Sequence, residues 1–411
     1  MAPISNRILI IGLVWPEPTS SAAGTRMMQL IKFYKLEGYE IFFASAANKS
    51  SFSENLEKIN ITEINIELNS NTFNEVLLNI NPNIVLFDRY ITEEQYGWRV
   101  REQLENTITI LDTEDLHFLR ISRAQSIKKN SEINLYNDVT RREIASILRC
   151  DLSLIISEEE MNLLKDEFRI DEDLLLYLPF LEEIPDHNHT SNWKTFEDRA
   201  NFMFIGNFLH EPNWHTTLTL KKEIWPKLSK LLPHTELHIY GAYPSEKVYQ
   251  LNNPKERFII KGRAENAVET LGKYRLLLAP IKFGAGAKGK LIDSMQSGTP
   301  NITTVIGAEG MNIDHIWNGA IAQNMEEFID EAYTFYTQST NWYNAQQKGL
   351  ELLNLKYDKF KFYPKLTEKH LYLLNNLKNH RIKNFIGSIL NYNNINSFKY
   401  LSLWIQEKNK F

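Results

Sequence analysis

The sequence predicts an α/β protein made of two doubly wound domains followed by a helical C-terminal region. Three observations support this prediction. The chain has 411 residues, which is too long for one ordinary hydrophobic core and fits two domains of about 180 residues each. Short apolar runs alternate with helix-like segments, as in parallel strands joined by crossover helices. A polar stretch without periodicity, residues 182–200, separates two such sets and is the predicted linker.

The bulk composition narrows the class of protein. Hydrophobic residues make up 43% and charged residues 24% of the chain, which is typical of a soluble globular protein. The net charge of −5 argues against general nucleic-acid binding. The single cysteine, Cys150, excludes a disulfide framework and suits the reducing cytoplasm. The apolar run at Ile8–Trp15 is too short to span a bilayer, so we interpret it as the first strand.

The first domain, residues 1–181, opens with a strand, a helix and a second strand. The loop between the first strand and the helix is rich in Pro, Ser, Ala and Gly but has no GxGxxG, so a dinucleotide fingerprint is poorly supported. Strands are predicted at Arg7–Val14, Glu40–Ala44, Ile61–Leu68, Asn83–Phe87, Thr107–Leu111, Leu152–Ile156 and Leu174–Phe180, and helices at Arg26–Glu37, Thr72–Ile80, Glu93–Glu105, within Arg123–Leu148, and at Ser157–Phe168. Ser157 with Glu160 fits a capping box.

A polar stretch, residues 112–120, follows directly after the predicted strand Thr107–Leu111. Because ligands bind beyond the carboxyl ends of parallel strands, this stretch lies on the ligand side. In one interpretation Asp112, Glu114 and Asp115 hold Mg²⁺ or Mn²⁺. In the other interpretation, which we favour, Asp115 caps a helix and the side chain of His117 points into the cleft.

The second domain, residues 201–340, repeats the alternation. Its most informative part is residues 276–311, where the order is strand, small-residue loop, helix, strand, small-residue loop. The predicted elements are strands at Asn201–Ile205, Glu236–Tyr240, Arg257–Ile260, Leu276–Ala279 and Asn301–Val305, helices at Trp214–Leu231, Ser245–Leu251, Glu265–Leu271 and Lys288–Gln296, and small-residue loops at Phe283–Ala287 and Gly307–Gly310.

The helix after the first small-residue loop has features of an anion site. A helix N-terminus carries about half a positive charge and free N–H groups, and glycines let a phosphate come close to them. Lys288 and Lys290 place full positive charges at the same end, where a helix alone disfavours them. Asp293, one turn further on, can accept hydrogen bonds from sugar hydroxyls. The alternative is an ordinary strand-to-helix connection with solvated lysines.

The run PIKFGAGAKGKLIDSMQSGTP, with TTVIGAEGM after it, resembles the donor-site signature of nucleotide-sugar-dependent glycosyltransferases of the GT-B fold, in particular the large retaining family four (glycosyl transferases group 1). The resemblance extends over residues 8–325 and is strongest at residues 280–311. It implies two Rossmann-like domains facing across a cleft. It also implies transfer of a sugar from a nucleoside diphosphate to a hydroxyl acceptor, with retention of anomeric configuration and without a metal or another cofactor.

The resemblance also implies roles for particular residues. His117 contacts the donor sugar and Lys288 stabilises the departing diphosphate, so these two are the expected catalytic residues, with no metal ligand. The expected donor-binding residues are Gly24, Gly206, Asn207, Arg263, Phe283, Gly284, Gly286, Lys290, Asp293 and Glu309. Arg263 either stacks on the nucleobase or is solvated.

The sequence departs from the family pattern at two places. The usual pair of Glu residues is replaced by Ala285 and Asp293, which puts direct carboxylate recognition of the sugar in doubt. The loop after Gly206 lacks the usual basic residue in clear register.

The C-terminal region, residues 341–411, is predicted to be helical. Residues 359–411 hold ten basic and two acidic residues, a net of +8, so the rest of the chain carries −13. Basic residues mixed with aromatic and apolar ones suit an anionic membrane surface. The alternative is that these helices pack back on the acidic first domain. We therefore expect a cytoplasmic protein, either free or peripheral on the inner face of the membrane.

Three functional hypotheses follow. The first is a glycosyltransferase of surface glycan or glycoconjugate synthesis, with a nucleotide-sugar donor, a hydroxyl acceptor such as a lipid-linked glycan, and no nucleic-acid partner. The second is a sugar-nucleotide epimerase of the same fold, which would act on the donor alone. The third is a degenerate domain that binds nucleotide sugar without turnover.

Overall fold

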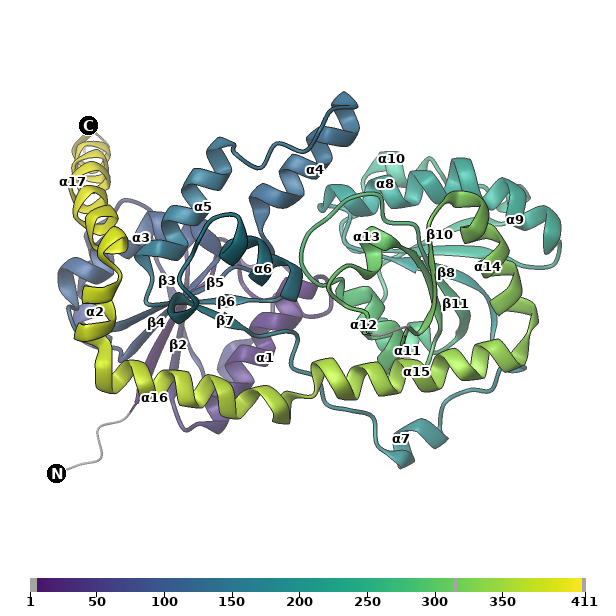
Figure 1. Cartoon of the computed structure of the whole chain (residues 1–411), viewed down its shortest axis with the longest axis horizontal. Helices are drawn as coiled ribbons and strands as arrows, with labels where there is room; N and C mark the ends of the chain where they lie inside the picture. Colours follow the sequence, from purple (N-terminus) through teal and green to yellow (C-terminus); the bar gives the residue numbers. More distant parts are fainter. Residues whose placement is uncertain (1–5, 314–315, 409–411) are drawn as a thin grey trace.

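The computed structural model describes residues 6–313 and 316–408 and consists of two α/β domains side by side (Figure 1). The first domain has a seven-stranded, fully parallel sheet in the order β3-β2-β1-β4-β5-β6-β7. Its strands are β1 (Arg7–Ile11), β2 (Glu40–Ser45), β3 (Thr62–Asn65), β4 (Ile84–Asp88), β5 (Ile108–Asp112), β6 (Leu152–Ile155) and β7 (Leu175–Tyr177). Its helices before the linker are α1 (Ala22–Leu36), α2 (Thr72–Ile80), α3 (Arg89–Gln103), α4 (His117–Lys129), α5 (Asp138–Arg149) and α6 (Glu158–Asp166).

The second domain has a six-stranded parallel sheet in the order β10-β9-β8-β11-β12-β13. The linker carries the short helix α7 (His187–Ser191). The strands are β8 (Ala200–Ile205), β9 (Leu237–Tyr240), β10 (Phe258–Gly262), β11 (Tyr274–Ala279), β12 (Asn301–Thr304) and β13 (Gly319–Ala322). The helices are α8 (Glu211–Thr219), α9 (Trp225–Leu231), α10 (Glu246–Tyr249), α11 (Ala267–Leu271), α12 (Gly289–Gln296), α13 (Val305–Ala308), α14 (Met325–Thr337) and α15 (Ser339–Tyr357).

The central strands are buried on both faces, which explains their continuous apolar sequences. Every residue of β4 and β5 is buried. Helices cover both faces of the first sheet, so that two hydrophobic clusters form, one on each side. The second sheet is arranged in the same way. The predicted fold class, two Rossmann-like domains with a helical C-terminal region, is confirmed.

Several helix ends differ from the prediction, because the capping hydrogen bonds that form are not those that the sequence pattern indicated. Helix α1 begins at Ala22, four residues early, because the Ser21 hydroxyl accepts a hydrogen bond from the Gly24 N–H at 3.0 Å. The capping box at Ser157 does not form, since its side chain makes no capping hydrogen bond. The second small-residue loop is partly the helix α13, which Thr304 caps through the Gly307 N–H at 3.1 Å.

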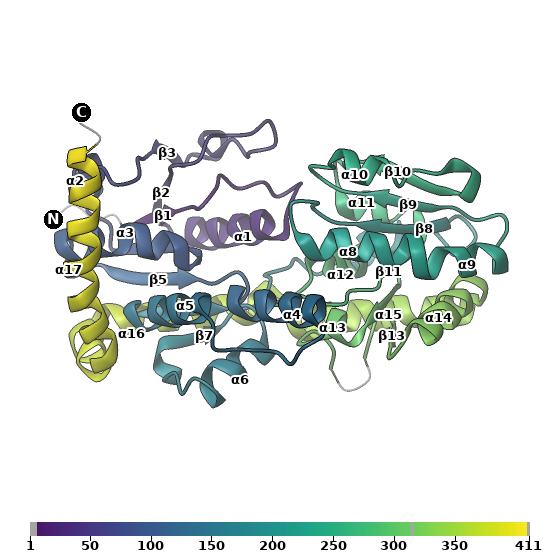
Figure 2. The ribbon, with the colours of Figure 1, turned by 90° about the horizontal axis from the view of Figure 1, so that it is seen from above.

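The C-terminal helices do not form the single unit predicted for residues 341–411. Helix α15 packs on the second domain, where Trp342 is fully buried in the core. The chain then returns, and α16 (Lys359–Lys383) runs along the first domain and contributes Phe362 and Leu366 to its core. Helix α17 (Phe385–Lys408) follows at the outer end of the first domain (Figures 1 and 2). Helices α16 and α17 thus both contact the first domain.

The polypeptide crosses between the domains twice, and the two crossings lie side by side. The Glu182 N–H donates to the Tyr357 carbonyl at 2.7 Å, and the Lys359 N–H donates to the Glu182 carbonyl at 3.1 Å. Glu183, on the first crossing, pairs with Lys32 and with Lys359, each at 2.7 Å. These contacts form the hinge between the domains.

Candidate functional site

A cavity of about 1140 Å³ lies between the domains. Both sheets reverse their strand order at an equivalent place, between β1 and β4 in the first domain and between β8 and β11 in the second. In open α/β sheets ligands bind in the crevice at such a switch point. The loops that follow these four strands line the cavity, so the fold itself places the site.

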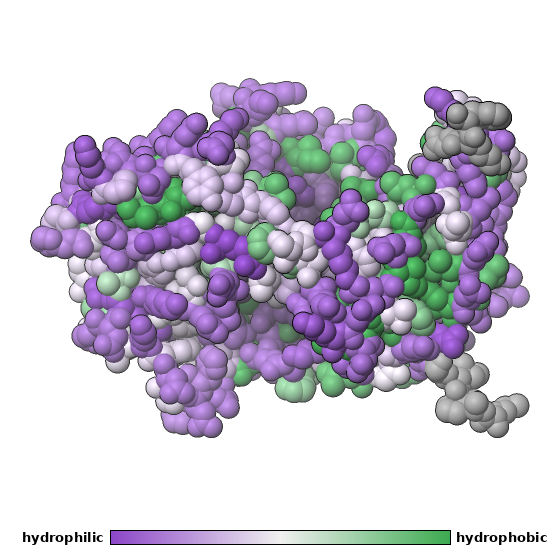
Figure 3. All heavy atoms as spheres, turned by 180° about the vertical axis from the view of Figure 1, so that it is seen from behind, coloured by the Kyte–Doolittle hydropathy of each residue, from purple (hydrophilic) through white to green (hydrophobic). Residues whose placement is uncertain are grey.

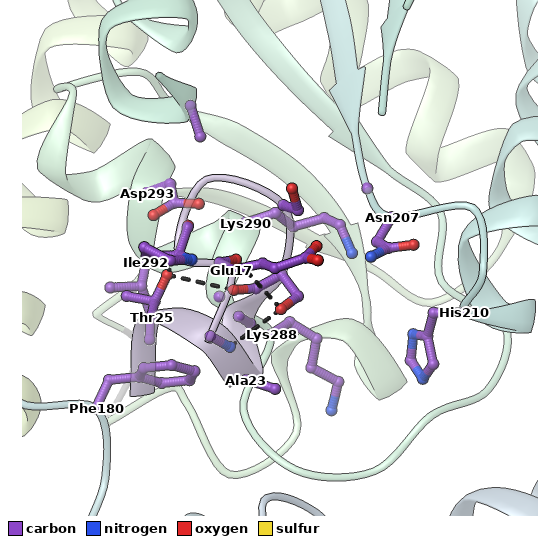
Figure 4. A pocket seen from close by; sticks show the side chains of 18 of the residues that line it. Glu17, Ala23, Thr25, Phe180, Asn207, His210, Lys288, Lys290, Ile292 and Asp293 are labelled. Carbon is purple, nitrogen blue, oxygen red and sulfur yellow. Dashed lines mark hydrogen bonds between the residues drawn. The ribbon is translucent and has the colours of Figure 1, made fainter. Parts of the chain in front are cut away.

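The wall contributed by the second domain carries the two predicted lysines at the start of α12. Lys288 is the N-cap residue and is buried, with its Nζ donating only to the Gly286 carbonyl, at 2.8 Å. Lys290 Nζ donates to Asn213 Oδ1 at 2.9 Å. In Figure 4 these lysine side chains extend toward the same hollow as Asn207 and His210. The N–H groups of α12 and two ammonium groups therefore converge on one space.

Burial shifts the pKa values of three ionisable side chains in this wall. It lowers the pKa of Lys288 to about 8. Burial and the neighbouring Lys288 charge lower the pKa of Lys290 to about 8. Burial and the Glu182 carboxylate raise the pKa of Asp293 to about 7. All three shifts disfavour the charged forms, and a bound anion would favour the charged form of the lysines.

The affinity for a nucleoside diphosphate is expected to fall as the pH rises above about 8. Lys288 and Lys290 then lose their protons in the free protein, whereas the terminal phosphate, with a last pKa of about 6, is already fully ionised. Each lysine that must be charged weakens binding by up to about tenfold per pH unit. Calorimetric titration on both sides of pH 8 measures this. A Lys288→Arg variant should show a smaller pH dependence, and equal affinities for the wild type would contradict the assignment.

The opposite wall, from the first domain, contains His117 at the first position of α4. Its Nδ1 lies 3.2 Å from the Asp115 carbonyl and 3.5 Å from Glu143 Oε1. Burial opposes its charge, but Glu143 and Asp115 outweigh this effect and raise the pKa of His117. The helix cap differs from the prediction. The carboxylate of Glu143, not that of Asp115, accepts hydrogen bonds from the first N–H groups of α4. Its Oε1 lies 3.2 Å from the His117 nitrogen, and its Oε2 lies 3.0 Å from the Phe118 nitrogen.

The acidic cluster does not gather as the metal interpretation requires. Asp112 is fully buried and binds Arg26 through both oxygens, at 2.9 and 3.0 Å. Asp115 pairs with Arg120 at 2.8 Å. Among the residues that the structure describes, no three His, Cys, Asp or Glu side chains are placed to hold a metal ion.

Glu114 and Asp115 of this cluster both line the cavity, and Glu114 differs from Asp115 in having an unpaired oxygen. Its Oε1 is buried without a hydrogen bond, and burial together with Asp112 raises its pKa to about 8. Asp88 lies in the same wall, and its buried Oδ1 likewise accepts no hydrogen bond. Arg89, 3.6 Å from Asp88, and Glu114 both have positive φ values, +69° and +64°. Unmet polar atoms and strained backbone in one wall are typical of ligand sites.

Side chains join the two domains on either side of the cavity. Arg123 of α4 forms two hydrogen bonds with Glu309, at 2.6 and 2.8 Å, and donates to the Gly284 carbonyl at 2.8 Å. On the other side, Tyr243 donates to both Glu17 oxygens, at 2.9 and 2.8 Å. The domains are thus in contact around the cavity.

Ten of the twelve predicted site residues line the cavity. They are Gly24, His117, Gly206, Asn207, Arg263, Phe283, Gly284, Lys288, Lys290 and Asp293. The Arg263 guanidinium lies over the Phe52 ring, 4.2 Å from its centre, and its stacking on a nucleobase stays a prediction.

Gly286 and Glu309 are not part of the cavity lining but lie where the domains meet. The Gly286 N–H donates to Glu160 of the first domain at 2.8 Å. A Cβ at Gly286 would come within 2.9 Å of Asp115, so only glycine allows this approach. Their roles in donor binding remain predictions.

Sequence reasoning did not select several cavity residues. Arg120 and Asn213 line the cavity but belong to no recognisable sequence motif. Arg120 donates a hydrogen bond to Asp115, and Asn213 accepts one from Lys290. His210, in the loop after β8, could have been found as the polar residue in the place of the missing basic one.

The comparisons with known proteins agree with this geometry. Residues 199–338 match the family model described as Glycosyl transferases group 1. No curated protein is similar enough in sequence to count as a relative.

Three solved structures illustrate the likeness in fold. Sucrose-phosphate synthase from Thermosynechococcus elongatus superposes with a TM-score of 0.69 at 13% identity, over 90% of this chain and 99% of that one. HepE from Anabaena, in complex with UDP and glucose, has a TM-score of 0.65 at 11% identity, over 88% of this chain and 98% of that one. WaaG, a glycosyltransferase involved in lipopolysaccharide biosynthesis, has a TM-score of 0.60 at 11% identity, over 87% of this chain and 98% of that one. The chain thus has the GT-B fold, and residues 199–338 match the glycosyl transferases group 1 model.

Proposed function

We propose that this protein is a glycosyltransferase that moves a sugar from a nucleoside diphosphate to a hydroxyl acceptor, with retention of anomeric configuration, in the synthesis of a surface glycan or glycoconjugate. The observation that carries the proposal is the convergence of Lys288, Lys290 and the α12 N-terminus on a cavity whose other wall holds His117. A diphosphate is the ligand that matches two ammonium groups, that of the buried Lys288 and that of the half-buried Lys290, at a helix N-terminus. HepE, which shares the fold, is described in complex with UDP-glucose.

In the proposed mechanism, Lys288 and the α12 amides stabilise the charge that develops on the departing diphosphate. Such preorganised electrostatic stabilisation is typically the largest catalytic contribution. Asp293 accepts hydrogen bonds from the ribose, and His117 contacts the sugar as positive charge develops on it. Closure of the domains about the hinge excludes water, which otherwise competes with the acceptor. The reaction is proposed to need no metal and no other cofactor.

We assign the acceptor to the wall formed by Asp88, Arg89 and Glu114. The free Asp88 and Glu114 oxygens can accept hydrogen bonds from hydroxyl groups, and Arg89 can donate to them. This chemistry suits a sugar of a glycan or of a lipid-linked glycan.

The test of the proposal is a thermal-shift screen against UDP, GDP, dTDP and CDP and their common sugars, with and without EDTA. A ligand at a hundred times its Kd stabilises the native state by about 2.7 kcal/mol. We expect one nucleotide to raise the melting temperature, equally with EDTA. The absence of any shift would reject the nucleotide site, and a shift that EDTA abolishes would reject metal independence. Product formed from donor alone would indicate an epimerase, and binding without turnover a degenerate domain.

His117→Ala is expected to lower turnover while nucleotide affinity stays the same, because the side chain lies in the wall opposite Lys288 and Lys290. The measurement is kcat together with the Kd of the nucleoside diphosphate. Unchanged turnover would leave His117 with only a structural role beside Glu143.

A further inference from the structure

Among the residues of helix α17 whose side chains the structure describes, Asn391 and Ser402 make polar contacts with the first domain. Of its residues whose burial is described, only Gly387 and Ser402 are buried. The Ser402 hydroxyl accepts a hydrogen bond from Arg99 Nη2 at 3.3 Å. Asn391 Nδ2 donates to the Arg149 carbonyl, also at 3.3 Å. A surface helix of a globular protein normally has the opposite arrangement, with its apolar stripe toward the core.

Eight apolar or aromatic side chains of α17 are exposed, among the residues whose burial is described. In the view from behind, hydrophobic residues gather at the end of the molecule that carries α17 (Figure 3). The exposed apolar and aromatic residues of α17 are Phe385, Ile386, Ile389, Tyr392, Tyr400, Leu401, Leu403 and Trp404. Contiguous exposed apolar surface of this kind marks an interaction site.

The charge around this face selects its partner. Residues 359–411 carry +8, against −13 on the rest of the chain. Seven of the ten basic residues belong to α16, and Lys399 and Lys408 belong to α17. Lys408 lies over Trp404, with Nζ 5.2 Å from the ring centre, and Lys383 is exposed. An anionic bilayer attracts this region and repels the remaining surface, so it also fixes the orientation of the protein.

The length and position of α17 fit a helix that lies on a membrane. Its 24 residues span about 36 Å. Among the residues that the structure describes, no helix is long and apolar enough to cross a bilayer. Helix α17 lies at the end of the first domain away from the second domain, so contact there leaves the cavity accessible (Figures 1 and 2).

We propose that the exposed apolar face of α17 binds the surface of an anionic lipid bilayer, with Tyr and Trp rings and leucine side chains entering the headgroup region and lysines contacting the phosphates. This inference does not depend on the sugar-transfer proposal.

The test uses the full chain and two kinds of vesicle, phosphatidylcholine alone and phosphatidylcholine mixed with phosphatidylglycerol. The wild type should sediment with the mixed vesicles at least tenfold more strongly than with the neutral ones. The double variant Leu401→Glu/Trp404→Glu should lose at least tenfold of this binding. Leu231→Glu is the matched control, because Leu231 and Leu401 are both 51% exposed and Leu231 lies on the second domain. It should bind like the wild type.

Three results would overturn the proposal. The first is wild-type protein that stays in solution with the mixed vesicles, and the second is a double variant that still sediments with them. The third is a wild-type dimer in light scattering that the double variant converts to a monomer, which would assign the face to a second copy of this chain. Because both substituted side chains are exposed, the melting temperature should not change, and its measurement separates lost binding from lost folding.

Discussion

Lys288→Ala should lower turnover at least tenfold, toward the hundredfold or so that loss of one preorganised electrostatic donor typically costs. The side chain is buried at the start of α12, and within the described residues its Nζ donates one hydrogen bond, to the Gly286 carbonyl. Burial already disfavours its charge, so its removal should change the melting temperature little. The measurement is the rate of nucleoside diphosphate release from the donor found in the nucleotide screen.

Lys282 provides the matched control for this substitution. Like Lys288, it lies in the connection between β11 and α12. Its side chain is partly exposed, and its Nζ lies 2.6 Å from Glu223 Oε1. Lys282→Ala should therefore retain wild-type turnover. A wild-type rate in Lys288→Ala would remove this residue from the phosphate site, because no other role in turnover follows from its position.

Arg26→Ala should lower the free energy of unfolding of the first domain by about 3–5 kcal/mol, the usual cost of removing one partner of a buried ion pair. Arg26 and Asp112 are 1% and 0% exposed. Arg26 also donates to the Leu178 carbonyl at 2.8 Å. The substitution leaves the Asp112 carboxylate buried and uncompensated. Urea denaturation, followed by a signal of the first domain, measures the change.

Two further variants test the cause of this loss. Lys32→Ala, on the same helix, removes an exposed pair with Glu183 and should cost less than about 1 kcal/mol. Arg26→Met combined with Asp112→Leu removes both charges and should recover most of the lost stability. If Arg26→Ala were as mild as Lys32→Ala, the buried pair would not be holding the first domain together.

The parts of the site that were predictable depend on neighbours in sequence. The glycine loop, the lysines and α12 lie within a few residues of one another, so their pattern alone indicated an anion site. The alternation of apolar runs likewise indicated both sheets, because burial on both faces leaves a continuous apolar strand.

The contacts that sequence reasoning missed join residues far apart in the chain. Glu143 caps α4 from a position 26 residues away. Arg26 pairs in the interior with Asp112, which lies 86 residues further on in the chain. Arg123 meets Glu309 across 186 residues. No local pattern encodes such pairs, since they form only after the domains assemble.

The return of the chain at α16 also sets the order in which the domains can be completed. The second domain is continuous in sequence, whereas the core of the first includes Phe362, Leu366 and Leu373 from the C-terminal part of the chain. A ribosome adds roughly 5–20 residues per second, so these side chains follow the first sheet by roughly ten seconds or more. The second domain is therefore fully synthesised while the core of the first is still incomplete. The first domain begins to be synthesised before the second, but its core is completed after it.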